Sequence, residues 1–178
     1  KVVAGTVWML RQSVSAFLDG RGSPDPHDIP TPEKFWSDCV GIVTPHRAQR
    51  ALVIRELEEL FPNEKNLIDD AVDTVERFQG GQRHTIIVTF GVADTAVISG
   101  EEAFLMQLER TNVAVSRAMA KCIVVMPKSL AAHIPEDKKA LATAFALKDY
   151  IEEFCNVRVE TTLSTGAESR LAQVRYHQ

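Results

Sequence analysis

Two arginines follow the apolar run Cys39–Thr44 and open a helical pattern. They are Arg47 and Arg50, in the stretch TPHRAQR that begins at Thr44. Ligands of open α/β sheets bind at the carboxyl ends of the strands, so arginines that leave a strand end are placed to meet a negatively charged group. The alternative is a helix that exposes its arginines to solvent.

A second polar stretch, VDTVERFQGGQ over residues 72–82, contains hydrogen-bond donors that can bind a phosphate. Thr74 interrupts an apolar strand, and its hydroxyl with the nearby backbone N–H groups can bind a phosphate oxygen. Gln79 precedes Gly80 and Gly81, where the backbone can approach a ligand closely. The alternative is an ordinary β-turn with polar residues.

A third stretch, NVAVSRA over residues 112–118, places one long cation among small residues. Ala114, Ser116 and Ala118 surround Arg117. Small neighbours let a helix pack tightly against a sheet while the arginine reaches across a gap. The alternative is a structural arginine at the surface.

Several well-known motifs for phosphate binding, metal binding and hydrolysis are absent from the sequence. It contains no GxxxxGK[ST] phosphate loop, no GxGxxG, and no HExxH, EF-hand or GxSxG motif. The five histidines are scattered, which favours surface or loop positions over metal ligation. We therefore predict that the chain does not hold a triphosphate by itself in the usual way, and we predict no metal site.

Short runs rich in Val and Ile alternate with helical patterns. They predict the strands and helices that position the candidate site residues of the three polar stretches. Strands are expected at Cys39–Thr44, Ala71–Val75, Thr85–Phe90 and Lys121–Met126, and helices at residues 1–18, 49–61, 101–119 and 137–154. Most of the strand runs barely alternate, which is typical of strands buried on both faces. The order predicts an α/β fold with an open, mainly parallel sheet.

The predicted domain boundaries follow from changes in residue composition along the chain. Residues 19–32 are rich in Gly, Pro and Asp and predict an exposed loop, which we extend to residue 37. We assign residues 1–160 to one domain. Residues 161–178 have few large apolar side chains and predict a strand stub followed by a mobile tail.

Composition narrows the classes of function. The 178 residues include 20 Lys and Arg against 24 Asp and Glu, a net charge of −4, which excludes binding of nucleic acid by bulk charge. No apolar run reaches the roughly 18 residues of a membrane helix. Three cysteines without CxxC spacing favour a reducing, intracellular compartment, and we expect a cytoplasmic location. The chain begins without Met or a signal-peptide pattern, so we expect a piece of a longer protein.

Taken together and in order, TPHRAQR, VERFQGGQ and RTNVAVSRA resemble motifs IV, V and VI of the superfamily 1 helicases. The most similar pattern is that of the branch containing the RNA helicase of nonsense-mediated decay and its bacterial relatives. The resemblance covers about Val40 to Met126. It implies the C-terminal, second RecA-like domain of such a DNA or RNA helicase, with helices on both faces of the sheet.

The resemblance also implies a function shared with a second domain. In the family, ATP and Mg²⁺ lie between two RecA-like domains, and the first domain supplies the phosphate loop and most metal contacts. Arg50 and Arg117 match arginines that act as catalytic arginine fingers. Gln79, Gly80 and Gln82 match nucleotide-binding positions. The implied partners are the first RecA-like domain of the same polypeptide and a single strand of DNA or RNA, with no membrane.

The same resemblance implies which residues contact the strand. Thr44, Pro45, His46 and Thr74 match nucleic-acid-binding positions, and His46 stands where the family usually has an aromatic residue that can stack.

Two departures from the family pattern support an alternative function. Gln82 replaces a glutamate that grips the ribose, and Met119 replaces a second arginine. The alternative is a catalytically degenerate RecA-like binding or regulatory module in a larger nucleic-acid-associated protein. A third alternative is an unrelated α/β domain with chance matches.

The helicase hypothesis makes a spatial prediction. Four residues should gather at the carboxyl ends of the strands: Arg50, Gln79, Gly80 and Arg117. The buried residues of the sheet should include Val43, Ile87, Val88, Val124 and Val125.

Overall fold

A computed structural model describes residues 1–12, 30–75, 77–78, 81–106, 112, 115–165 and 168–177. The chain forms two compact units. The first comprises Lys1–Gly91 with Glu109–Met126, and the second comprises Val92–Leu108 with Pro127–Gln178. No helix in the described part of the chain combines the length and apolar character needed to cross a bilayer. All three cysteines are free.

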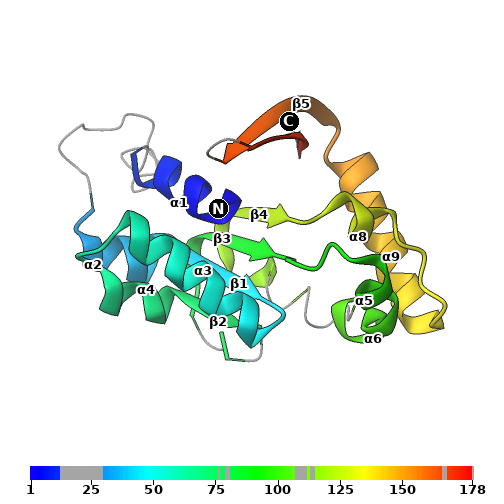
Figure 1. Cartoon of the computed structure of the whole chain (residues 1–178), viewed down its shortest axis with the longest axis horizontal. Helices are drawn as coiled ribbons and strands as arrows, with labels where there is room; N and C mark the ends of the chain where they lie inside the picture. Colours follow the sequence, from blue (N-terminus) through cyan, green and yellow to red (C-terminus); the bar gives the residue numbers. More distant parts are fainter. Residues whose placement is uncertain are drawn as a thin grey trace. The chain divides into compact units, whose positions relative to one another are not determined.

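A four-stranded sheet forms the centre of the first unit (Figure 1). Its strands are β1 (Val40–Thr44), β2 (Val72–Thr74), β3 (Arg83–Thr89) and β4 (Ala118–Val125), in the order β2-β1-β3-β4. Every neighbouring pair is parallel. Parallel neighbours need a crossover connection, which explains why helical segments separate the Val- and Ile-rich strands in the sequence. The α/β class with a parallel sheet is therefore confirmed.

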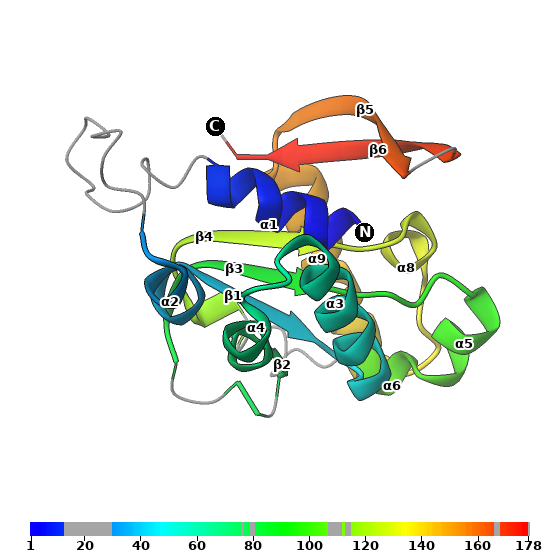
Figure 2. The same cartoon turned by 60° about the vertical axis from the view of Figure 1, so that its left-hand side comes forward.

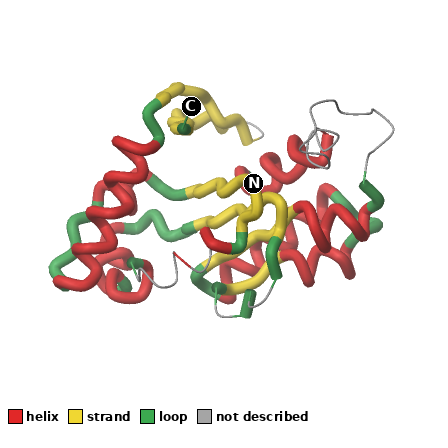
Figure 3. Tube along the Cα trace, turned by 180° about the vertical axis from the view of Figure 1, so that it is seen from behind, coloured by secondary structure: helices red, strands yellow, loops and turns green. Residues whose placement is uncertain are grey.

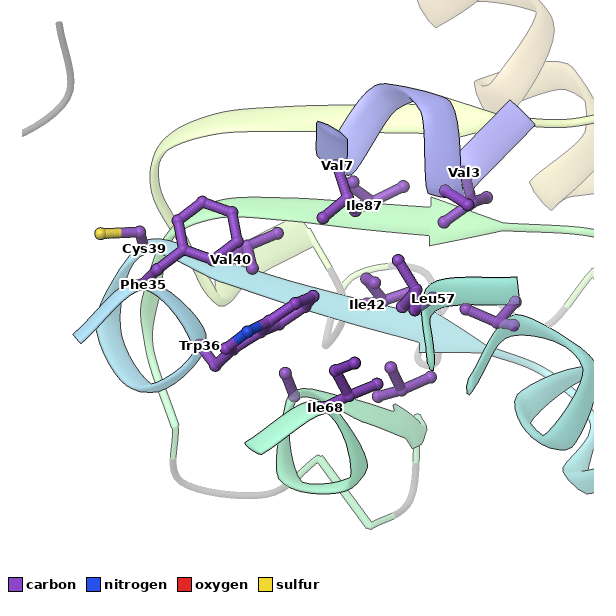
Figure 4. Packing of buried hydrophobic residues seen from close by; sticks show 14 residues of the cluster. Val3, Val7, Phe35, Trp36, Cys39, Val40, Ile42, Leu57, Ile68 and Ile87 are labelled. Atoms are coloured by element: carbon purple, nitrogen blue, oxygen red, sulfur yellow. The ribbon is translucent and has the colours of Figure 1, made fainter. Parts of the chain in front are cut away.

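Several helical segments of the first unit lie in its described part between Lys1 and Gly91. They are α1 (Val2–Gln12), α2 (Pro32–Lys34), the π-helix η2 (Phe35–Cys39), α3 (Arg47–Leu60) and α4 (Lys65–Ala71). Of these, α1, α3 and α4 lie over the same face of the sheet (Figure 2). Figure 4 shows the core that they enclose, which includes Val3, Val7, Phe35, Trp36, Ile42, Leu57, Ile68 and Ile87.

Residues 35–37 are not an exposed loop, contrary to the prediction for residues 19–37. Phe35 and Trp36 are only 1% and 2% exposed. Trp36 donates its indole N–H to the Glu64 carboxylate and packs edge-on against Phe61. Burying two large aromatic rings outweighs the loop-forming tendency of the preceding prolines. Residues 19–29 lie outside the described part of the chain.

The opposite face of the sheet has its own apolar cluster. Val43, Phe78, Ile86 and Val88 are buried there. Together with the fully buried Ile87, they confirm the predicted burial of β1 and β3. Val124 and Val125 are only partly buried, so their predicted burial is wrong. The reason is the position of β4 at the edge of the described sheet.

The second unit is mainly helical and ends in a hairpin. Its elements are α5 (Thr95–Gly100), α6 (Glu102–Leu105), α8 (Lys128–Ala132), α9 (Lys138–Asp149), the π-helix η3 (Tyr150–Phe154), β5 (Val157–Thr165) and β6 (Glu168–Tyr176). The last two strands pair antiparallel and appear as the two-stranded element near the C-terminus in Figure 3. The predicted tail over residues 161–178 is thus part of a strand pair in its described part, in which alternating residues such as Val174 and Tyr176 share one face of a pleated strand.

One carboxylate ties the helices of the second unit together. Glu102 Oε2 lies 2.9 Å from His133 Nε2, and Glu102 Oε1 accepts hydrogen bonds from the backbone N–H groups of Asp137 (2.9 Å) and Glu136 (3.1 Å). The Asp137 N–H is the largest cause that lowers the pKa of Glu102, followed by the His133 side chain. The contact joins α6 to the segment that begins α9.

Replacing Glu102 with glutamine should therefore have a pH-dependent effect. Because the folded-state pKa of Glu102 lies below its ordinary value, the carboxylate stabilises the fold above that ordinary value, and the contribution disappears as pH falls through the lowered pKa. Thermal unfolding should show Glu102→Gln less stable than the natural chain at about pH 7, with a smaller difference at about pH 3. An equal difference at both pH values would contradict this role.

Candidate functional site

Two polar residues meet at the carboxyl edge of the sheet. Thr44 and Thr74 end β1 and β2 and are direct partners in the strand register. Both are buried, and the Thr44 hydroxyl donates a 3.0 Å hydrogen bond to the carbonyl of His46. That bond shapes the turn through Pro45 into α3. The structure thus brings together the four residues predicted to contact a nucleic-acid strand, and Pro45 and His46 are more exposed than the two threonines.

Gln49 was missed as a site residue, although it lies within TPHRAQR. Its Nε2 donates to the carbonyl (3.0 Å) and hydroxyl (3.2 Å) of Thr89 at the end of β3. Its Oε1 is buried without a hydrogen-bond partner. A Cβ at Gly91 would lie 2.8 Å from the Gln49 amide, so that glycine leaves room for the side chain. A polar residue between two arginines at a helix start was the available signal.

Arg50 makes several contacts within the unit. Its Nε donates to the Val72 carbonyl at 2.7 Å, and its Nη2 donates to the Asp69 carbonyl and carboxylate, both at 2.9 Å. Asp73 lies within ion-pair distance at 3.6 Å. The guanidinium therefore joins α3 to the junction of α4 and β2.

Of the predicted nucleotide-binding residues, Gln82 lies with Arg117 at the other edge of the sheet. Gly81 and Gln82 directly precede β3, and Arg117 directly precedes β4. Parallel strands run in one direction, so residues that precede them lie at the amino edge. The predicted carboxyl-edge position is therefore wrong for Arg117. Gln79 and Gly80 lie outside the described residues.

Arg117 is a half-buried cation whose hydrogen-bonding capacity is not fully used. Its carbonyl accepts a 3.0 Å hydrogen bond from the Arg83 N–H. Its Nε is buried without a hydrogen-bond partner. Among the residues that the structure describes, no carboxylate lies within ion-pair distance of it. A buried N–H without an acceptor is costly, and an oxyanion is the acceptor that a guanidinium binds best.

Arg83, the first residue of β3, was also missed by sequence reasoning. Its guanidinium lies over the Phe78 ring, 5.5 Å from the centroid, and Nη1 donates to the Gln82 carbonyl at 3.1 Å. Its Nε is buried and has no partner. Burial lowers the pKa of Arg83, opposed by the charges of Asp38 and Asp70. Its position directly after Gly-Gly-Gln was the only signal in the sequence.

The structure does not bring Arg50 and Arg117 together. Arg50 is bonded to β2 and Arg117 precedes β4, which are the two outer strands of the sheet. Three interstrand steps separate these strands, a distance of about 14 Å. Both arginines can reach one phosphate only if Arg50 releases its present partners.

The chemistry of the amino edge suits an anion. Arg83 and Arg117 offer guanidinium donors there, each with a buried Nε that has no hydrogen-bond partner. In the described ranges, no three His, Cys, Asp or Glu side chains are grouped to hold a metal ion. The donors present therefore fit phosphate oxygens rather than the metal that accompanies them.

Comparison with known proteins identifies the family. The AAA domain family model matches residues 27–129. The probable helicase senataxin of Mus musculus is 38% identical over 79 residues, or 44% of this chain and 3% of that protein. The DNA replication ATP-dependent helicase/nuclease of Saccharomyces cerevisiae is 34% identical over 100 residues, or 56% of this chain and 6% of that protein.

An archaeal protein is similar in the same way. An uncharacterized ATP-dependent helicase of Methanocaldococcus jannaschii is 36% identical over 89 residues, or 50% of this chain and 12% of that protein. The matched part of the chain is thus a small share of each relative. The family match and the parallel sheet agree with the three motifs: the chain belongs to the AAA domain family and is a RecA-like domain of the superfamily 1 helicase type.

Proposed function

We propose that this chain is the second, C-terminal RecA-like half of an ATP-dependent superfamily 1 helicase. It supplies an arginine finger, Arg117, to ATP that a first RecA-like domain holds together with Mg²⁺. It also offers a surface to single-stranded DNA or RNA. The observation that supports the proposal most is the buried Nε of Arg117, which lacks an acceptor next to the nucleotide-binding motif.

Arg117 has the properties that transfer of a phosphoryl group requires. A guanidinium stays charged at any physiological pH and presents a rigid fork of donors to phosphate oxygens. When bound, the nucleotide and Mg²⁺ supply the phosphoryl group and neutralise part of its charge. Arg117 stabilises the charge that develops on the phosphate oxygens, and such an arginine is worth on the order of a thousandfold in rate.

The residues around β3 complete the nucleotide contacts in this proposal. Gln79 and Gly80 border the nucleotide, and the exposed Gln82 offers its amide to the ribose. An amide both donates and accepts hydrogen bonds, so it can replace the usual carboxylate without its charge. Arg50 as a second arginine finger stays a prediction from the family resemblance.

The carboxyl edge supplies the proposed contacts with the nucleic-acid strand. The Thr44 hydroxyl shapes the turn and Thr74 pairs with Thr44 in register. Pro45 and His46 present the accessible surface, where His46 can stack on a base or a ribose. The net charge of −4 agrees with binding through a few placed contacts.

A degenerate binding or regulatory module is the second candidate function. Met119 is 60% exposed at the start of β4, where the family has another arginine, and Gln82 lacks the charge of the family's glutamate. Each of the two residues replaces a charged side chain of the family's nucleotide site, which lowers the expected affinity for the nucleotide. These two replacements favour the alternative function.

ATP hydrolysis by two proteins tests the proposal. One is this chain alone, and the other is the polypeptide in which it follows its first RecA-like domain. We expect hydrolysis, stimulated by single-stranded nucleic acid, only in the longer protein. Strong hydrolysis by the 178-residue chain alone would contradict a shared site. A longer protein that binds ATP and a strand but does not hydrolyse ATP would favour the regulatory module.

A further inference from the structure

Arg83 and Arg117 are neighbours at the amino edge of the sheet. The Arg83 N–H donates to the Arg117 carbonyl at 3.0 Å, and Arg83 pairs in register with Ala118. Adjacent strands are about 4.8 Å apart, so the backbones of Arg83, at the start of β3, and Arg117, just before β4, are close enough for their long side chains to extend toward one phosphate. Both have a buried Nε without a hydrogen-bond partner.

Other part-buried arginines of the first unit differ in their charge balance. Arg50 pairs with the carboxylates of Asp69 and Asp73, and Arg11 pairs with Glu64 at 3.2 Å. Neither Arg83 nor Arg117 lies within ion-pair distance of a carboxylate among the described residues. Asp38 and Asp70 act on Arg83 only from beyond ion-pair distance, so both cations lack a direct carboxylate partner in the part of the chain that the structure describes and are suited to an external anion.

Two glycines leave the space in which the Arg83 side chain lies. A Cβ at Gly81 would come within 2.8 Å of Arg83 Nη1. A Cβ at Gly41 would lie 2.6 Å from the Phe78 ring and 3.0 Å from Arg83 Cγ. The missing Cβ atoms leave room for the side chain, and the contact with the Phe78 ring restricts the guanidinium, which reduces the entropy lost when an anion binds.

We propose that Arg83 is a second phosphate-binding arginine of the nucleotide site, acting beside Arg117. The inference rests on the proposed function, because it assigns Arg83 to the same nucleotide. It gives the site two adjacent cations at one edge without requiring Arg50 to leave its partners in the first unit. The ligand is the phosphate chain of a nucleoside triphosphate rather than the backbone of a nucleic acid, whose proposed contacts lie at the opposite edge.

The test follows the arginine Nε–Hε signals of the ¹⁵N-labelled 178-residue chain by NMR. Inorganic pyrophosphate is the probe, and sodium chloride at the same ionic strength controls for screening. We expect pyrophosphate to shift the signals of Arg83 and Arg117 with one common dissociation constant. Arg83→Gln should weaken binding about tenfold or more, and Arg83→Lys should weaken it less, since lysine keeps the charge but not the fork.

Arg55→Gln is the matched control, because Arg55 is an exposed arginine on α3. Its affinity for pyrophosphate should equal that of the natural chain. The backbone amide spectrum shows whether each variant is folded. If Arg83→Gln does not fold, the Arg83 signal of the natural chain and the lysine variant still decide the question.

The outcomes separate the two proposals. If pyrophosphate moves only the Arg117 signal, or if a short oligothymidylate rather than pyrophosphate moves the Arg83 signal, the role of Arg83 is wrong and that of Arg117 stands. If neither signal moves and Arg117→Ala leaves ATP hydrolysis by the longer protein unchanged, the proposed function fails as well.

Discussion

Replacing Arg117 with alanine should lower ATP hydrolysis about a thousandfold in the polypeptide that joins this chain to its first RecA-like domain. The guanidinium stabilises charge that grows on the transferred phosphate, so the loss should appear mainly in kcat and less in KM. Lysine at the same position should recover only part of the activity, because one ammonium cannot bind two phosphate oxygens in the geometry of a fork. Steady-state kinetics with saturating single-stranded nucleic acid measure both constants.

The matched control for this experiment is Arg55→Ala on the exposed side of α3, which should leave kcat unchanged. Unfolding measurements on both variants show whether the fold is intact, and little change is expected for Arg117→Ala because its Nε has no hydrogen-bond partner to lose. Hydrolysis at the natural rate in Arg117→Ala would exclude the role of Arg117 as an arginine finger.

Replacing Arg50 with alanine should mainly reduce stability. The change removes the donor to the Val72 carbonyl and the partner of Asp69. Leaving one part-buried acceptor without a donor costs about 1–3 kcal/mol in the free energy of unfolding. The salt bridge to Asp69 adds little, because the Asp69 side chain is 62% exposed and screened by solvent. Chemical denaturation of the 178-residue chain measures the difference.

Arg47→Ala is the control for Arg50→Ala, because Arg47 lies on the same helix and is exposed. It should change the free energy of unfolding by less than about 0.5 kcal/mol. Natural stability in Arg50→Ala, combined with a large loss of ATP hydrolysis in the longer protein, would overturn the structural role and support the arginine finger that the family resemblance predicts.

The sheet could be predicted from the sequence because its strands are short runs of Val and Ile with helical patterns between them. The core strands β1 and β3 have the strongest such runs, and residues such as Ile42 and Ile87 are fully buried. The helical stretch predicted over residues 101–119, with a break near Thr111, is confirmed in part. Helix α6 occupies Glu102–Leu105 and residues 112, 115 and 116 are helical, whereas β4 already begins at Ala118. Local apolar spacing cannot distinguish a continuous helix from short helices followed by a strand.

The terminal hairpin was missed for a related reason. Strands β5 and β6 contain many Thr, Ser and charged residues and few large apolar ones. Their pairing depends on a cross-strand register, such as Val159 opposite Val174, which appears only when both strands are considered together.

The site was predicted by residue type but not by position. Each motif was correctly associated with a neighbouring strand, yet Arg117 and Gln82 precede their strands and therefore lie at the amino edge. The partners of Arg50 come from α4 and β2, about 20 residues later in the sequence, and no local pattern indicates them. Arg83 differs from an ordinary surface arginine only through Phe78 and two glycines, one of them on another strand.

A structure of the longer protein with ADP, Mg²⁺ and aluminium fluoride at the nucleotide site tests the central claim most directly. The fluoride complex takes the place of the phosphoryl group in transfer. We predict Arg117 nitrogen atoms within about 3 Å of it, a hydrogen-bond distance, with the nucleotide held by the first RecA-like domain. A complex in which Arg117 points away and the amino edge of β3 and β4 contacts no part of the nucleotide would contradict the proposed function.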